Sequence, residues 1–138
     1  MGVEVRAEKV VKVYRTGKVE VVALRGLDMH VKPGEIVSVM GPSGCGKTTL
    51  LNLIGGLDRP TAGSIYVDGW DVAKASEKEL EKYRLLKVGF VFQFFNLIPT
   101  LTALENVELP MAMAGAPKSE RRRRAKELLE MVGLAGRM

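Results

Sequence analysis

The chain has 138 residues, a formal net charge of +5 and 46% hydrophobic residues, as expected for one intracellular α/β domain with a single core. Its one cysteine, Cys45, excludes an internal disulfide and favours a reducing compartment, the cytoplasm. No apolar run approaches the roughly 20 residues that span a bilayer, and residues 4–9 are charged where a signal peptide is apolar. We therefore expect no direct membrane insertion, and any membrane role to depend on a partner protein.

The first third of the chain predicts antiparallel strands. Three β-rich runs, Val3–Val13, Val19–Leu24 and Leu27–Val31, are separated by short turns. Because short turns join neighbouring strands in antiparallel order, we expect an antiparallel sheet packed beside a parallel core. His30, in the third run, and Trp70, after a later turn, are interpreted as structural residues.

A glycine-rich motif follows these strands. Residues 41–48 read Gly-Pro-Ser-Gly-Cys-Gly-Lys-Thr and match the pattern G-x-x-x-x-G-K-[ST]. The apolar run Glu35–Met40 predicts a buried parallel strand before the motif, and Thr48–Ile54 predicts a helix after it. A loop in this position points backbone N–H groups at a polyphosphate, with Lys47 on the β- and γ-phosphates and the Thr48 hydroxyl on Mg²⁺. The alternative is a glycine-rich turn with a surface lysine. It would explain neither the match of residues 41–48 to the motif nor the predicted strand and helix on either side of it.

The middle of the chain predicts a strand, a helix and a second core strand. Ser64–Val67 has the composition of a strand between two turns. Ser76 and Glu79 form a capping box ahead of a helix that ends near Leu86. The run Val88–Phe92 then predicts another buried parallel strand, whose carboxyl end would meet the phosphate loop.

The last third predicts two helices. Thr102 and Glu105 form a second capping box, and Pro110 should kink or split the helix that follows. A helix is also predicted over residues 119–132, with Ala125, Leu128, Leu129 and Val132 as its buried stripe. The four arginines at 121–124 then form a solvated face, with Glu120–Arg124 and Arg123–Glu127 as local pairs; an electrostatic patch for a partner or anionic lipid is the alternative. Positive charge is otherwise spread along the chain, so we expect no nucleic-acid partner.

Several blocks in order carry a family resemblance: Tyr14, Gly41–Thr49, Leu57–Gly63, Val91–Leu97 and Leu101–Val107. In these blocks the chain resembles the ATP-binding subunit of an ABC transporter almost end to end. Within that superfamily it is most similar to the branch serving lipoprotein release, macrolide-type efflux and the related cell-division complex. The resemblance implies an α/β fold: a P-loop NTPase core with an antiparallel β subdomain and the start of a helical subdomain. We expect a single ABC-type domain over 1–138, divided into 1–34 (mainly antiparallel β), 35–93 (P-loop core) and 94–138 (Q-loop and start of the helical subdomain).

The resemblance also implies ATP and Mg²⁺ as ligands and assigns residues to them. Tyr14 corresponds to an aromatic residue that stacks on adenine; a half-buried strand tyrosine is the alternative. Gln93 corresponds to the Q-loop glutamine, which contacts Mg²⁺ and the attacking water; a polar strand cap is the alternative. Lys47 and Gln93 are thus the implied catalytic residues, and Thr48 and Gln93 the metal ligands. The implied nucleotide-binding residues besides Tyr14 and Gln93 are Gly41, Pro42, Ser43, Gly44, Cys45, Gly46, Lys47, Thr48 and Thr49.

The same resemblance implies two protein partners. Transmembrane transporter subunits would bind the segment after Gln93, beginning Phe94–Pro99, although Phe94 and Phe95 could equally pack under their own loop. A second ATP-binding subunit would complete a homodimer. Through the transmembrane subunits, the protein would be peripheral on the inner face of the cell membrane.

Three family motifs have no counterpart in residues 1–138: the Leu-Ser-Gly-Gly-Gln signature, the strand ending in a metal-binding aspartate and catalytic glutamate, and the switch histidine. We therefore expect the chain to be the N-terminal portion of an ATPase that couples ATP hydrolysis to transport, and to bind Mg-ATP but hydrolyse little by itself. A short, non-hydrolysing nucleotide-binding module is the alternative. A P-loop kinase or other NTPase is disfavoured by Tyr14, Gln93 and the block Leu101–Val107.

Overall fold

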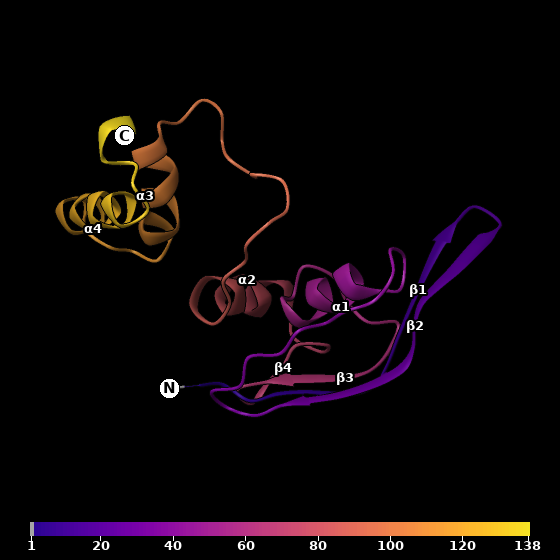
Figure 1. Ribbon diagram of the computed structural model, residues 1–138. Coiled ribbons are helices and arrows are strands. Elements are labelled where there is room, and N and C mark those ends of the chain that lie inside the picture. The colour runs from indigo at the N-terminus through magenta and orange to yellow at the C-terminus, as the bar shows by residue number, and fades with distance from the viewer. Residues whose placement is uncertain (1) are drawn as a thin grey trace. The chain divides into compact units, whose positions relative to one another are not determined.

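The computed structural model describes residues 2–138, which form two compact units: the residues up to Arg84, and Leu85–Met138 (Figure 1). The divisions expected at 34 and 93 remain predictions. The elements in chain order are β1 (Val5–Thr16), β2 (Val19–Val31), α1 (Lys47–Ile54), β3 (Ala62–Val67), β4 (Trp70–Asp71), α2 (Glu77–Leu86), α3 (Ala103–Met113), α4 (Lys118–Met131) and the 3-10 turn η1 (Ala135–Arg137).

The first unit contains a four-stranded sheet in the order β2-β1-β3-β4, and every neighbouring pair in it is antiparallel. This confirms the antiparallel sheet predicted from the first third of the chain. The two runs Val19–Leu24 and Leu27–Val31 join into the single strand β2, since an irregular register with β1 absorbs the residues between them. β1 continues past Val13 to Thr16, so Tyr14 lies within a strand.

One face of this sheet forms the core of the first unit. Val10 of β1 and Ile65 of β3 are fully buried there. Helices α1 and α2 lie on the same side of the sheet (Figure 1) and contribute buried Leu53 and Tyr83. The ring of Tyr83 lies 5.8 Å from that of Trp70, which bears out a structural role for this tryptophan. Burial of such side chains stabilises the unit by roughly 1.5–3 kcal/mol each.

The two parallel core strands predicted at Glu35–Met40 and Val88–Phe92 are not formed. Neither segment is a strand, and side chains such as Ile36 (99% exposed) and Val91 (fully exposed) extend into solvent. A strand exists only where a neighbour receives its backbone hydrogen bonds, and a parallel strand normally has neighbours and covered faces on both sides. Among residues 2–138 all strand pairs are antiparallel, and none includes either segment. The described fold is therefore mixed α/β with an antiparallel sheet.

Both predicted capping boxes are confirmed on their N-cap side. The Oγ of Ser76 accepts a hydrogen bond from the Glu79 amide at 3.2 Å, and the Oγ1 of Thr102 accepts one from the Glu105 amide at 3.1 Å. The expectation that Pro110 splits the second helix is wrong, because α3 continues through it to Met113. A proline removes only one N–H donor, and the amides of Ala114 and Gly115 still donate to the carbonyls of Pro110 and Ala112 at the end of the helix, each at 3.1 Å.

In the second unit α3 packs against α4, where Ala125 and Leu129 form the buried stripe. Val132, predicted to share that stripe, is 69% exposed because α4 ends at Met131. No helix among residues 2–138 has the length and apolar character needed to cross a bilayer.

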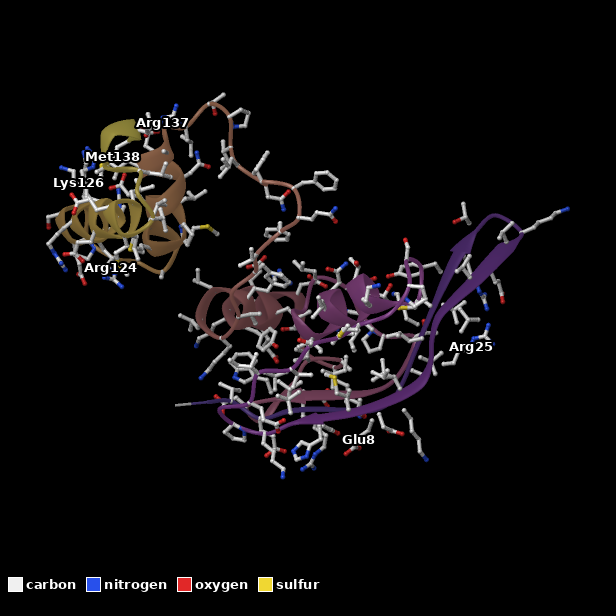
Figure 2. All side chains as sticks on the ribbon, in the orientation of Figure 1. Glu8, Arg25, Arg124, Lys126, Arg137 and Met138 are labelled. Atoms are coloured by element: carbon white, nitrogen blue, oxygen red, sulfur yellow. The ribbon has the colours of Figure 1, made fainter. Side chains whose placement is uncertain are left out.

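The arginines of α4 divide into two groups. Arg122 donates to both oxygens of the buried Glu108 on α3, at 3.2 and 3.3 Å, and thereby holds the pKa of that carboxyl below its usual value. Arg123 and Arg124 both pair with Glu127, which replaces the predicted pair between Glu120 and Arg124. Arg124 projects from α4 (Figure 2) and is exposed, so the solvated-face interpretation is correct for this part of the run.

Candidate nucleotide-binding site

The glycine-rich segment forms an exposed turn that leads directly into α1. α1 begins at Lys47, and Gly46 before it has a φ of 97°, a conformation that favours glycine. Gly44 also has a positive φ, 84°. The first four amides of a helix have no intrahelical acceptor, and no acidic side chain occupies the first turn of α1. The N-terminus of α1 therefore presents donors and the positive end of the helix dipole to an anion.

Lys47 lies across this turn. Its Nζ donates hydrogen bonds to the carbonyl oxygens of Gly41 and Pro42, the latter at 3.1 Å. The turn itself is closed by the amide of Cys45, which donates to the Pro42 carbonyl at 3.2 Å. An ammonium forms stronger hydrogen bonds with charged oxygens than with carbonyls, so a phosphate at the turn can take over these contacts.

The turn rests on β2. Lys12 of β1 pairs with Leu24 and Val13 pairs with Val22, which leaves Ala23 of β2 without a partner on β1. This bulge brings the Ala23 carbonyl so close to Gly46 that an added Cβ would lie 2.7 Å from its oxygen. The bulge thus sets the position of the turn relative to the sheet, and only glycine fits at the contact.

Tyr14 lies on β1 opposite Val21, with 38% of its surface exposed. Its hydroxyl donates to Oδ2 of Asp58 at 3.1 Å, and the Nζ of Lys12 lies over its ring, 5.1 Å from the centroid. Neither Asp58 nor Lys12 is among the residues predicted from the sequence. Two signals could have indicated them: Asp58 lies in a block of the family resemblance, and Lys12 is two residues from Tyr14 on the same strand.

The carboxyl group of Asp58 is held in its charged form. Partial burial, the largest influence, raises its pKa. Three hydrogen bonds and one charge outweigh burial and bring the pKa of Asp58 below its ordinary value of 3.8. The hydrogen bonds come from the Arg59 amide, Lys12 and Tyr14, and the charge is that of Lys12. Asp58 is therefore an ionised acceptor for the Tyr14 hydroxyl at neutral pH.

The remaining predicted site residues are exposed or half-buried. Thr48 is exposed in the first turn of α1, and Thr49 follows it. Gln93 lies in the second unit, in an exposed bend beside Phe94, so its place at a metal or nucleotide site stays a prediction. No group of three or more His, Cys, Asp or Glu side chains among residues 2–138 is arranged to hold a metal ion.

The aromatic segment after Gln93 is exposed. Phe94 is 77% and Phe95 is 88% accessible, so the alternative that both pack under their own loop is wrong. The side chain of Asn106 instead organises the following residues, because its Oδ1 accepts from the Ile98 amide at 2.9 Å and its Nδ2 donates to the carbonyls of Ile98, Leu101 and Thr102.

A glycine-rich turn that opens a helix, with a lysine lying across it, is the phosphate-binding arrangement of P-loop proteins. Comparison with known proteins then defines the family. The model of the family described as "ABC transporter" matches residues 24–137, and the chain belongs to this family, in which it corresponds to the ATP-binding component.

Individual relatives agree with this assignment. The chain is 55% identical over 127 residues to an uncharacterized ABC transporter ATP-binding protein of Thermotoga maritima, covering 92% of this chain and 54% of that protein. It is 50% identical over 114 residues to the lipoprotein-releasing system ATP-binding protein LolD of Bacteroides fragilis, covering 83% of this chain and 53% of LolD. The ATP-binding cassette MJ0796 of Methanocaldococcus jannaschii, solved as a dimer in a post-hydrolysis state with ADP and Pi, matches with a TM-score of 0.87 and 49% identity. That match covers 92% of this chain and 56% of the solved one, so the chain spans about half the length of these relatives.

Proposed function

We propose that this chain is part of the ATP-binding subunit of an ABC transporter and binds ATP with Mg²⁺ through residues 41–49. The observation that carries the proposal is the exposed glycine-rich turn at the N-terminus of α1, with Lys47 across it. Four charges on a triphosphate need main-chain donors and a mobile cation, and this turn offers both. The exposed hydroxyl of Thr48, in the first turn of α1, suits a hard cation such as Mg²⁺.

The two ends of the nucleotide are assigned to different residues. Tyr14, with an exposed ring on β1, is proposed to stack on adenine, since an aromatic face binds any base without edge hydrogen bonds. Gln93 is proposed to contact Mg²⁺ and the attacking water near the γ-phosphate. Bound Mg²⁺ would supply charge neutralisation of the phosphates, while Lys47 holds their oxygens in place.

The bound nucleotide is proposed to drive transport through protein partners. The exposed Phe94 and Phe95 form an apolar surface of the kind that partners bury, and we assign it to transmembrane subunits. A second ATP-binding subunit is proposed to complete a homodimer, since MJ0796 is solved as a dimer. The subunit would then lie on the inner face of the cell membrane through its transmembrane partners.

Turnover by residues 1–138 is proposed to be slow. Residues 1–138 contain no counterpart of the family's strand that ends in a metal-binding aspartate and a catalytic glutamate. Loss of such a group costs roughly 10²- to 10⁴-fold in rate. The chain should therefore bind ATP while hydrolysing it at least about a hundredfold more slowly than a full-length relative.

Calorimetric binding of Mg-ATP tests the proposal. Replacing Lys47 with alanine removes a charge-assisted contact and should weaken ATP binding by roughly ten- to a hundredfold. Lys78→Ala, on the exposed surface of α2, is the matched control and should leave the affinity unchanged. Equal affinities for the Lys47→Ala variant and the unaltered chain would refute ATP binding at the turn, and steady hydrolysis at the rate of a full-length relative would refute slow turnover.

A further inference from the structure

The loop that follows α1 is attached to β1 beside Tyr14. The amide of Thr61 donates to the Val11 carbonyl at 2.8 Å, and the amide of Val13 donates to the Thr61 Oγ1 at 2.9 Å. These hydrogen bonds hold residues 58–61 along the part of β1 that carries Tyr14. Since α1 begins at the glycine-rich turn, one short helix connects that turn to the loop beside Tyr14.

Two charged side chains at this junction hold the ring of Tyr14. The Nζ of Lys12 donates to Oδ1 of Asp58 at 3.1 Å and to the Arg59 carbonyl at 2.6 Å. The other carboxylate oxygen of Asp58 accepts the Tyr14 hydroxyl at 3.1 Å. The Lys12 side chain is only 13% exposed, so this pair is less screened than an ordinary surface ion pair. The ring is therefore held at its hydroxyl by a carboxylate and at one face by an ammonium.

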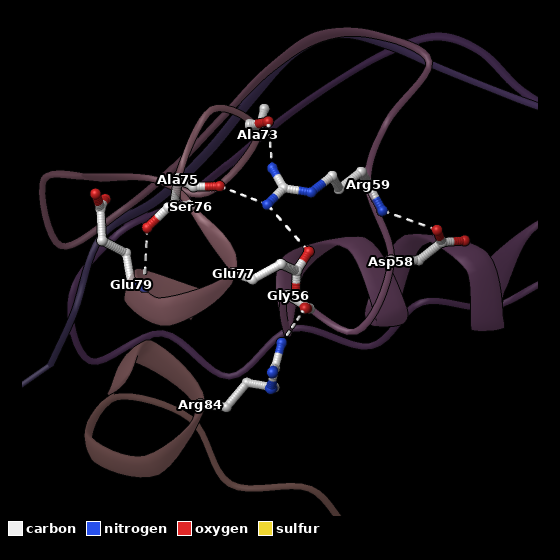
Figure 3. A network of polar contacts seen from close by, with 9 residues as sticks. All are labelled: Gly56, Asp58, Arg59, Ala73, Ala75, Ser76, Glu77, Glu79 and Arg84. Carbon is white, nitrogen blue, oxygen red and sulfur yellow. Dashed lines mark hydrogen bonds and ion pairs between the residues drawn. The ribbon is translucent and has the colours of Figure 1, made fainter. Parts of the chain in front are cut away.

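Asp58 is itself fixed by its neighbour Arg59. The Arg59 amide donates to Oδ1 of Asp58 at 2.8 Å. The Arg59 guanidinium donates to the carbonyls of Ala73 and Ala75 and to the carboxylate of Glu77, at 3.2, 2.5 and 3.3 Å (Figure 3). The loop is thus anchored to the segment before α2 and to the first residue of α2, and the carboxylate of Asp58 has a defined position from which to hold Tyr14.

We propose that Asp58 and Lys12 are positioning residues for base binding, which hold the Tyr14 ring in one orientation so that a purine base can stack on it. This inference rests on the proposed role of Tyr14 in ATP binding. An exposed side chain loses rotamer freedom when a ligand stacks on it, and a ring that is already ordered avoids most of that cost. The ammonium of Lys12 covers one face of the ring, so the base would stack on the opposite face.

Calorimetry with two ligands, ATP and inorganic tripolyphosphate, tests this role, because only ATP has a base. Tyr14→Phe removes the hydroxyl but keeps the ring, and Asp58→Ala removes its acceptor. Each should weaken ATP binding by roughly two- to tenfold, the effect of one hydrogen bond, and leave tripolyphosphate binding unchanged. Combined, the two changes should weaken ATP binding no further than either one alone. Asp28→Asn is the matched control, since Asp28 accepts a hydrogen bond from the Lys9 amide of β1 at 2.9 Å.

Tyr14→Ala separates this inference from the proposed function. Loss of the ring should weaken ATP binding by roughly ten- to a hundredfold, as for a lost base–aromatic stack, and full ATP affinity in Tyr14→Ala would refute the proposed stacking itself. With stacking established, three results would overturn the positioning role: unchanged ATP affinity in Asp58→Ala, equal weakening of ATP and tripolyphosphate, or an undiminished effect of Asp58→Ala in the Tyr14→Ala background. Lys12→Met should show the same selective loss of ATP affinity as Asp58→Ala.

Discussion

Two glycines of the glycine-rich turn before α1 provide a matched pair of substitutions. Gly44 and Gly46 have similar positive φ angles, 84° and 97°. Replacing either with alanine forces a side chain into the left-handed region, which costs about 1–2 kcal/mol. Only at Gly46 does the added Cβ also meet backbone, the Ala23 carbonyl of β2 at 2.7 Å. Overpacking of this kind adds about 1–3 kcal/mol. Gly46→Ala should therefore lower the free energy of unfolding by about 2–5 kcal/mol, and Gly44→Ala should lower it by only about 1–2 kcal/mol.

Urea unfolding measures this difference. Trp70 is the only tryptophan and packs against Tyr83 in the first unit, so its fluorescence reports unfolding of the unit that contains the turn. The midpoint for Gly46→Ala should lie well below that for Gly44→Ala, at a similar denaturant dependence. Equal losses of stability in the two variants would refute the argument that the Ala23 bulge positions the turn.

Two further predictions concern polar contacts outside the turn. The Tyr83 hydroxyl donates to the Ile54 carbonyl at 2.6 Å, so Tyr83→Phe should lower the free energy of unfolding by about 1–3 kcal/mol, and unchanged urea stability would contradict this. Burial raises the pKa of Tyr83 from 10.0 to about 12. The contribution of the protonated Tyr83 to the free energy of unfolding is therefore complete below pH 10 and is lost as the pH rises through about 12. An absorbance titration of the tyrosines would follow this change. Asn106→Ala should speed hydrogen exchange at the Ile98 amide by roughly tenfold, the value of one hydrogen bond. An unchanged exchange rate there would show that Asn106 does not order the loop.

Features coded by neighbouring residues could be predicted from the sequence. The hydroxyl of Ser76 and that of Thr102 each cap a helix as predicted, because a capping box is complete within four residues. The helix α1 begins at Lys47, one residue before the predicted start at Thr48, and ends at Ile54 as predicted. Each of these elements depends on local geometry alone, and periodicity or a short motif is enough to locate it.

Features that depend on distant partners could not be predicted. The contact between Tyr14 and Asp58 joins residues 44 positions apart, and no local pattern indicates which carboxylate a strand tyrosine will meet. The run Glu35–Met40 has the composition of a buried strand, but strand formation also requires a pairing partner, and none is present among the strands of residues 2–138. Composition thus indicates that a segment is able to form a strand, while topology decides whether it does.

The antiparallel strand β2 connects the two ends of the candidate site. Val21 pairs with Tyr14, the proposed base-stacking residue, and Ala23, two positions later, contacts Gly46 of the proposed phosphate-binding turn. Two residues along a strand span only about 7 Å. The irregular register at Ala23 therefore affects both parts of the candidate site. A one-residue slip of β2 against β1 would change the residue opposite Tyr14, and it would also move the Ala23 carbonyl that lies next to Gly46. One short stretch of β2 therefore determines the spacing between Tyr14 and the glycine-rich turn, to which the base and the phosphates are assigned in the proposed function.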